Sequence, residues 1–114
     1  MVSILDSIKQ LLGIDINDNN FDKELIVYIN GAIMVINQLG VGEPGYYIKD
    51  KGDVWEEFTQ YRDDLEIVKS VIYLRVRLLF DPPQNSFLVS AIEKQIQEYD
   101  WRITMNSQST IVGG

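Results

Sequence analysis

Apolar residues recur at every third or fourth position in two segments of the first third of the chain. Residues 3–12 place isoleucines and leucines at this spacing, and Gly13 follows them, which predicts a short amphipathic helix. A polar stretch, residues 15–20, supplies residue types that favour helix starts. The next segment carries one apolar stripe, made up of Phe21, Leu25, Ile29, Ile33 (or Ala32) and Ile36. Gly40 ends this predicted helix, because glycine readily adopts the left-handed conformation found there.

The most apolar segment of the chain is Leu65–Phe80. Its apolar residues form two neighbouring stripes, Leu65, Val68, Ile72 and Leu79 on one and Ile67, Val71, Leu74 and Leu78 on the other. A helix that is apolar over so much of its circumference normally packs on two sides, so we expect this helix to be central. Pro82 and Pro83 end it, and Asn85 or Ser86 begins a last helix whose apolar face runs to Ile103.

The longest region without a helical period is residues 40–52. It contains four glycines, Pro44 and two adjacent tyrosines. Because it is longer than the usual connection between helices, we expect an interaction site in this loop, at Tyr46, Tyr47 and Ile48.

After the loop, Asp53-Val54-Trp55-Glu56 has the spacing of a capping box, with an acid at the cap and a glutamate three residues later. It predicts a helix with Trp55 and Phe58 on its apolar face, continued by Tyr61 or Arg62.

The C-terminal residues 104–114 are small and polar, and Ser109, Thr110, Ile111 and Val112 favour a β conformation. We therefore expect an extended, flexible tail that becomes ordered by adding to a neighbouring molecule. Residues 1–103 are expected to form one helical domain. The predicted fold class is all-α: a small bundle of four to five helices with a long loop rich in glycine and tyrosine and an extended C-terminal tail.

Composition removes most catalytic chemistry from consideration. The chain has 114 residues, 46% of them apolar, and contains neither cysteine nor histidine. Disulfides, thiol nucleophiles, the commonest general base and the usual zinc ligands are therefore unavailable. We expect no catalytic residue, no metal and no cofactor. No apolar run is long enough to span a membrane, and the first twelve residues do not resemble a signal peptide.

The net charge is −7, with 17 acidic and 10 basic residues. A protein that binds duplex DNA needs clustered lysine and arginine, so the charge argues against a DNA-reading surface. An acidic surface is compatible with a protein partner, with mimicry of DNA, or with a wall along which DNA slides without binding. Solubility alone is the simplest explanation.

Three motifs have structural interpretations that are better than the catalytic or binding ones. Residues 40–45 match G-x-G-x-x-G, but a helix precedes them and Pro44 removes an amide, so they predict a turn. Asp15, Asn17 and Asn19 have the spacing of a calcium loop without its glycine and final glutamate, and helix capping explains them. The adjacent acids at 56–57 and 63–64 diverge on a helix, so we expect a solvated face.

Arginine and tryptophan near the apolar helices have two interpretations. The stems of Arg75 and Arg77 can lie along apolar surface while their guanidinium groups pair with acids. Alternatively, these arginines contact a partner. Trp101 and Arg102 are the better candidates for a protein interface, because both residue types are enriched at interface hot spots.

The order of these segments resembles the small head–tail connector proteins of tailed bacteriophages, also called adaptor, head-completion or DNA-packaging proteins. The resemblance covers residues 3 to 103. Its motifs are Phe21-Asp22-Lys23-Glu24-Leu25, Gln38-Leu39-Gly40-Val41, Leu78-Leu79-Phe80-Asp81-Pro82-Pro83, Ile92-Glu93-Lys94-Gln95-Ile96 and Trp101-Arg102. The stop made by Asp81 and the two prolines is the most distinctive of these.

The resemblance implies a non-enzymatic virion protein, made in the bacterial cytoplasm, that forms a homo-oligomeric ring, commonly about twelvefold, beneath the portal protein. Such a ring would extend the DNA channel and dock the next connector or tail protein. DNA would pass through it without specific binding, and no membrane is involved. An alternative from a different class is an acidic DNA mimic or small regulatory module that binds a protein.

Overall fold

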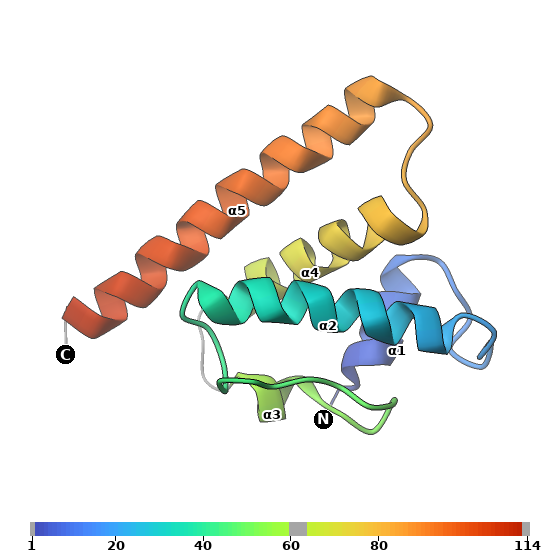
Figure 1. The fold of residues 1–114 in the computed structure, drawn as a ribbon, viewed down its shortest axis with the longest axis horizontal. Helices are drawn as coiled ribbons and strands as arrows, with labels where there is room; N and C mark the ends of the chain where they lie inside the picture. Colours follow the sequence, from blue (N-terminus) through green and yellow to red (C-terminus); the bar gives the residue numbers. More distant parts are fainter. Residues whose placement is uncertain (1, 60–63, 113–114) are drawn as a thin grey trace.

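The computed structural model describes residues 2–59 and 64–112, with side chains for residues 2–59 and 64–107. These residues form five helices and no strand, which confirms the all-α prediction. The helices are α1 (Ile4–Leu11), α2 (Asp22–Gln38), α3 (Trp55–Phe58), α4 (Leu65–Phe80) and α5 (Ser86–Val112). They make a thin molecule of 44 × 36 × 20 Å, with α5 along one edge and the loop before α3 along the other (Figure 1).

Helix α4 is the centre of the bundle, as its two apolar stripes predict. It packs against α2 on one side and α5 on the other. Its buried residues Val68, Val71, Ile72 and Val76 meet the buried stripe of α2, made up of Leu25, Ile29, Ala32, Ile33 and Ile36, and Ile96 and Ile103 of α5. Two residues predicted on these stripes are exposed instead. Phe21 lies at the start of α2 with its ring edge against Phe80, and Leu79 points away from the core.

The N-terminal helix is joined to the segment before α3. Ser3 caps α1 by accepting a hydrogen bond from the Asp6 amide (3.1 Å) and forms an isolated antiparallel bridge with Val54. The Trp55 indole is buried and donates to the Ser7 hydroxyl (3.1 Å). These contacts, between residues about fifty positions apart, fix one end of the loop.

Helix α3 is shorter than predicted, and its cap lies one residue later. The Val54 amide donates to the Glu57 carboxylate (3.0 Å), so Glu57 and not Glu56 completes the cap. Asp53 instead accepts hydrogen bonds from the loop that precedes it. Tyr61 and Arg62, predicted to continue the helix, lie outside the described residues.

The prediction of an extended C-terminal tail is wrong for residues 104–112, which continue helix α5. No glycine or proline interrupts the chain between Ser86 and Gly113, so nothing in the sequence stops the helix. Ile103 and Ser107, one turn apart, are both buried, and Ser107 lies beside Gly40 at the end of α2. This packing outweighs the β propensity of the segment. The side chains of Ser109, Thr110, Ile111 and Val112 lie outside the described part of the chain.

A buried lysine ties α1 to the start of α2. The side chain of Lys9 is only 1% exposed, and its ammonium group donates to the Asp22 carboxylate (2.9 Å) and to the Ile16 carbonyl (3.1 Å). Asp22 is partly open to water. The charge of Lys9 therefore depends on Asp22 more strongly than the charge of Asp22 depends on Lys9.

This asymmetry predicts unequal costs for removing the two partners. Asp22→Ala leaves a buried ammonium without its carboxylate and should lower the free energy of unfolding by about 3 kcal/mol. Lys9→Met keeps the apolar stem and leaves a carboxylate that water can solvate, so the cost should be about 1 kcal/mol. Urea unfolding followed by circular dichroism measures both, with the exposed Lys23→Met as control. Equal costs would contradict this account.

Candidate protein interaction surfaces

Two asparagines of α2 hold the long loop in one conformation. The Asn30 side chain accepts from the Ile48 amide (2.8 Å) and donates to the Ile48 carbonyl (3.0 Å), as a neighbouring strand would. The Asn37 side chain donates to the carbonyls of Val41 (3.0 Å) and Glu43 (2.9 Å). Sequence analysis did not identify either asparagine. Both are polar residues in a helix with many apolar residues, and a long loop follows that helix. This combination could have indicated that their side chains bond to the loop.

The far end of the loop is closed by Asp53. Its carboxylate accepts from the backbone amides of Lys49 and Asp50, the latter at 3.1 Å, and its other oxygen lies 3.5 Å from the Lys49 ammonium. Partial burial by itself would raise the pKa of this carboxyl group. The two amides and the nearby ammonium outweigh that effect and lower its pKa below the usual 3.8.

The structure separates the three predicted loop residues. Ile48 is 1% exposed and belongs to the core, so its side chain is not at the surface. Tyr46 is half-buried, stacked on Phe58 with 5.3 Å between ring centroids. Burial and the carboxylates of Asp53 and Glu57 raise the pKa of Tyr46 to about 12, so its phenol stays neutral.

Tyr47 is the exposed aromatic residue of the loop, with 60% of its surface accessible. The Lys49 ammonium lies 5.6 Å from the centre of its ring, and Lys51 is exposed two residues further on. We call Tyr47, Lys49 and Lys51 the loop patch. It combines an aromatic ring and two cations on a backbone that α2 and Asp53 hold in place.

The predicted pair Trp101 and Arg102 lies on the surface of α5. Trp101 is 63% exposed, and Arg102 pairs with Glu98 one turn earlier (2.8 Å). Exposed residues follow the same side of the helix at a spacing of seven and then four, and they define the outer face of α5: Phe87, Lys94, Trp101 and Met105. Large exposed apolar residues gathered on one face are typical of a protein interaction site.

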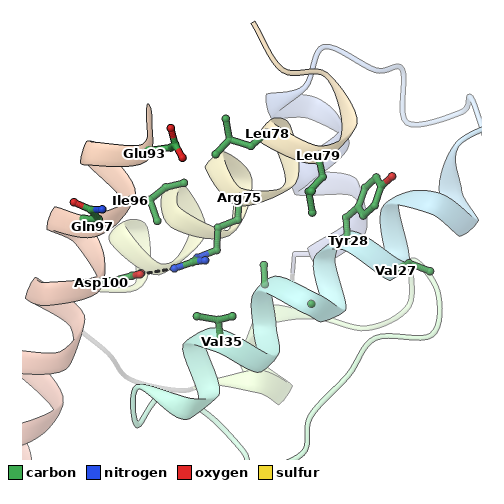
Figure 2. A pocket seen from close by; sticks show the side chains of 12 residues that line it. Val27, Tyr28, Val35, Arg75, Leu78, Leu79, Glu93, Ile96, Gln97 and Asp100 are labelled. Atoms are coloured by element: carbon green, nitrogen blue, oxygen red, sulfur yellow. Dashed lines mark hydrogen bonds and ion pairs between the residues drawn. The ribbon is translucent and has the colours of Figure 1, made fainter. Parts of the chain in front are cut away.

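A groove of about 660 Å³ lies between α2 and α5, with α4 at its base (Figure 2). Its α2 wall includes Val27, Gly31 and Val35, and its α5 wall includes Glu93, Gln97 and Asp100. Leu78 and Leu79 of α4 complete the apolar part, which explains why Leu79 is exposed although it continues an apolar stripe. We call this site the α2–α5 groove.

Arg75 and Asp100 form an ion pair inside this groove. The pairing confirms the structural interpretation of Arg75, whose stem lies along apolar surface while its guanidinium group meets an acid. The pair is incompletely bonded. Within the described part of the chain, the Arg75 Nε and the Asp100 Oδ1 are buried and have no hydrogen-bond partner. Glu93, two turns before Asp100, adds an exposed carboxylate to the same wall.

The described residues contain no candidate metal site and no helix that could span a membrane. Residues 2–59 and 64–112 contain no group of three or more acidic, histidine or cysteine side chains placed to hold a metal ion. Asp15, one of the three residues considered for a calcium loop, accepts a hydrogen bond from the Asn17 amide (2.8 Å), and the neighbouring Asp18 accepts one from the Asn20 amide (3.1 Å), so both are turn residues. Among the described helices, none combines the length and apolar character of a membrane span.

The family model of phage connector proteins matches residues 4–110, nearly the whole chain. The chain belongs to the phage connector family. This confirms the resemblance found in the sequence and points to a structural, non-enzymatic component of the phage particle. No curated protein and no solved structure matches the chain. In this connector, the loop patch and the outer face of α5 are exposed, and the α2–α5 groove is partly apolar.

The loop conformation of the connector depends on glycines, and two of them form a matched pair. Gly42 (φ +82°) and Gly45 (φ +75°) both adopt the left-handed conformation. A Cβ on Gly42 would lie 2.4 Å from the Phe58 ring, whereas a Cβ on Gly45 would meet nothing within 4 Å. Gly45→Ala should therefore cost about 1 kcal/mol of unfolding free energy from backbone strain alone, and Gly42→Ala about 3 kcal/mol or more. Thermal unfolding that ranks the two equally would show that the loop does not pack on Phe58.

The bonding of Asp53 predicts a pH dependence of stability. Because the pKa of Asp53 is lower in the folded protein than in the unfolded chain, its ionised form stabilises the fold above the usual carboxyl pKa. That stabilisation is lost as the pH falls through the folded pKa. Asp53→Asn should unfold at lower urea concentration than the wild type at neutral pH, and the difference should shrink between about pH 5 and pH 2. A difference that is constant over this range would contradict the role of the charge.

Proposed function

We propose that this connector forms a homo-oligomeric ring beneath the portal vertex of the phage head, extends the DNA channel and docks the next connector or tail protein. The observation that carries the proposal is the match of residues 4–110 to the phage connector family. A protein in this position works by contact. It must offer one surface to copies of itself and others to the components above and below.

The acidity of the chain supports a place along the DNA path. A net charge of −7 per subunit gives a ring whose field repels the phosphate backbone. Genomic DNA can then slide through the channel without being retained, since retention would need clustered lysine and arginine to neutralise phosphates. The same negative charge also keeps the subunit soluble.

The outer face of α5 supports docking to the portal or to the next component. Phe87 and Trp101 are among the most exposed large apolar residues of the described chain, and no element of the same subunit covers them. Exposed tryptophan is a frequent anchor at interfaces because it buries a large area with few rotatable bonds. The 27-residue length of α5 presents these side chains on a rigid rod.

Trp101→Ala is expected to weaken docking while leaving the subunit folded. Since Trp101 is 63% exposed, the variant should change the free energy of unfolding by less than about 1 kcal/mol. Electron microscopy of purified portal rings mixed with the connector should show bound rings for the wild type and few or none for the variant. Leu11→Ala removes a comparably exposed apolar side chain from α1 and should bind like the wild type.

Two results would contradict the proposed function. One is a wild-type protein that never forms rings, either alone or on the portal. The other is a set of heads that lack the connector and still keep their DNA and join tails. A monomer that competes with DNA for a nucleic-acid enzyme would favour the acidic DNA mimic instead.

A further inference from the structure

We propose that the ring is built head to tail, with the loop patch of one subunit seated in the α2–α5 groove of the next. The inference rests on the proposed function, and it specifies which surfaces of the subunit form the joint. A ring of identical subunits needs two different patches that complement each other, because only a heterologous contact can repeat around an axis.

The loop patch and the groove lie on different sides of α2. Asn30 and Asn37 hold the loop against one side of α2, while Val27, Gly31 and Val35 line the groove from another side of the same helix. In Figure 1 the loop lies below α2 and α5 lies above it. The loop patch of a subunit therefore cannot reach its own groove, and a second copy can supply it.

Opposite charges lie on the two surfaces. The loop patch carries Lys51, next to a Lys49 that pairs with Asp53. The α5 wall of the groove carries the exposed Glu93, together with an Asp100 that pairs with Arg75. In the described part of the chain, neither Lys51 nor Glu93 has an ion-pair partner. An exposed cation on the loop and an exposed anion in the groove suit a contact between copies, since complementary charge fixes register and rejects other partners.

The α2 wall of the groove contains a glycine that the subunit itself does not need. Gly31 lies in the middle of α2, where glycine is less favourable than alanine by roughly 0.5–1 kcal/mol. Apart from its chain neighbours and the adjacent backbone of α2, no atom of the described chain lies within 4 Å of where its Cβ would be, so packing within the subunit does not require glycine there. A close approach by another chain would require glycine at this position. The exposed ring of Tyr47, on a backbone already held rigid, is the group that would fill this space at small entropic cost.

The test is a charge exchange in the full-length chain. Assembly is measured by sedimentation velocity across a concentration series and by electron microscopy of rings, both alone and on purified portal rings. Lys51→Glu should place like charges in every joint, and Glu93→Lys should do the same. Each should raise the concentration needed for assembly about tenfold or more. The double variant K51E/E93K restores opposite charges, keeps the net charge of −7, and should return assembly to within about threefold of the wild type.

Two further variants test whether the effect depends on charge alone and whether the groove itself is needed. Lys94→Glu changes the net charge as Lys51→Glu does, but it lies on the outer face of α5, so ring formation should be unaffected. Gly31→Leu adds a side chain on the groove side of α2, at a position where an added Cβ meets no atom of the described chain within 4 Å. It should leave the melting temperature equal to or above that of the wild type, because leucine favours helix, and yet reduce assembly about tenfold or more.

The outcomes separate this inference from the proposed function. If the wild type forms rings and Lys51→Glu behaves like the wild type, the joint lies elsewhere while the connector function stands. If Lys94→Glu alone prevents ring formation, the outer face of α5 is the joint and the inference is wrong. If charge reversal leaves rings intact but abolishes attachment to the portal, the groove holds a portal segment rather than a second copy. If the wild type forms no ring under either condition, both proposals fail.

Discussion

The rest of the structure depends on the burial of α4 along two sides. Because its valines and isoleucines are covered by α2 on one flank and by α5 on the other, α4 holds these two helices apart and forms a floor between them. The α2–α5 groove exists for this reason. Leu78 and Leu79 continue the apolar surface of α4 beyond the core and into the groove. The same helix therefore buries apolar area within the subunit and also exposes apolar area in the groove.

Rigidity of the long loop is the second feature that matters for assembly. A loop with four glycines would lose much conformational entropy if it became ordered only on binding. Here the hydrogen bonds of Asn30, Asn37 and Asp53 order it in the free subunit, and Tyr46 packs it onto Phe58. Tyr47 and its neighbouring lysines are consequently presented before any partner arrives. In the proposed ring, this preorganisation would lower the entropic cost of each joint.

Ionic contacts in this protein serve different purposes according to burial. Lys9 and Asp22 join α1 to α2, with the lysine shielded from water and the carboxylate partly open to it, so the fold depends mainly on Asp22 as the partner of the buried ammonium group. Arg75 and Asp100 pair inside the groove, where one buried polar atom of each has no hydrogen-bond partner among the described residues. Arg102 and Glu98 lie in solvent and contribute little to stability. Most of the acidic surplus remains at the surface, where it suits the passage of DNA in the proposed ring.

The periodicity of apolar residues predicted the four longer helices and the central place of α4, because each is encoded by spacing within one segment. The family resemblance came from the order of these segments and from short motifs, which are also local features of the sequence. Trp101 could be predicted as a surface residue for a related reason, since it lies off the apolar stripe of its helix. Tertiary structure alone decided that Ile48 is core while Tyr47 is exposed, that Asn30 and Asn37 hold the loop, and that Lys9 is buried. It also decided that residues 104–112 are helical, since Ser107 packs beside Gly40. Each of these outcomes depends on contacts between residues distant in the chain, and spacing within one segment cannot predict such contacts.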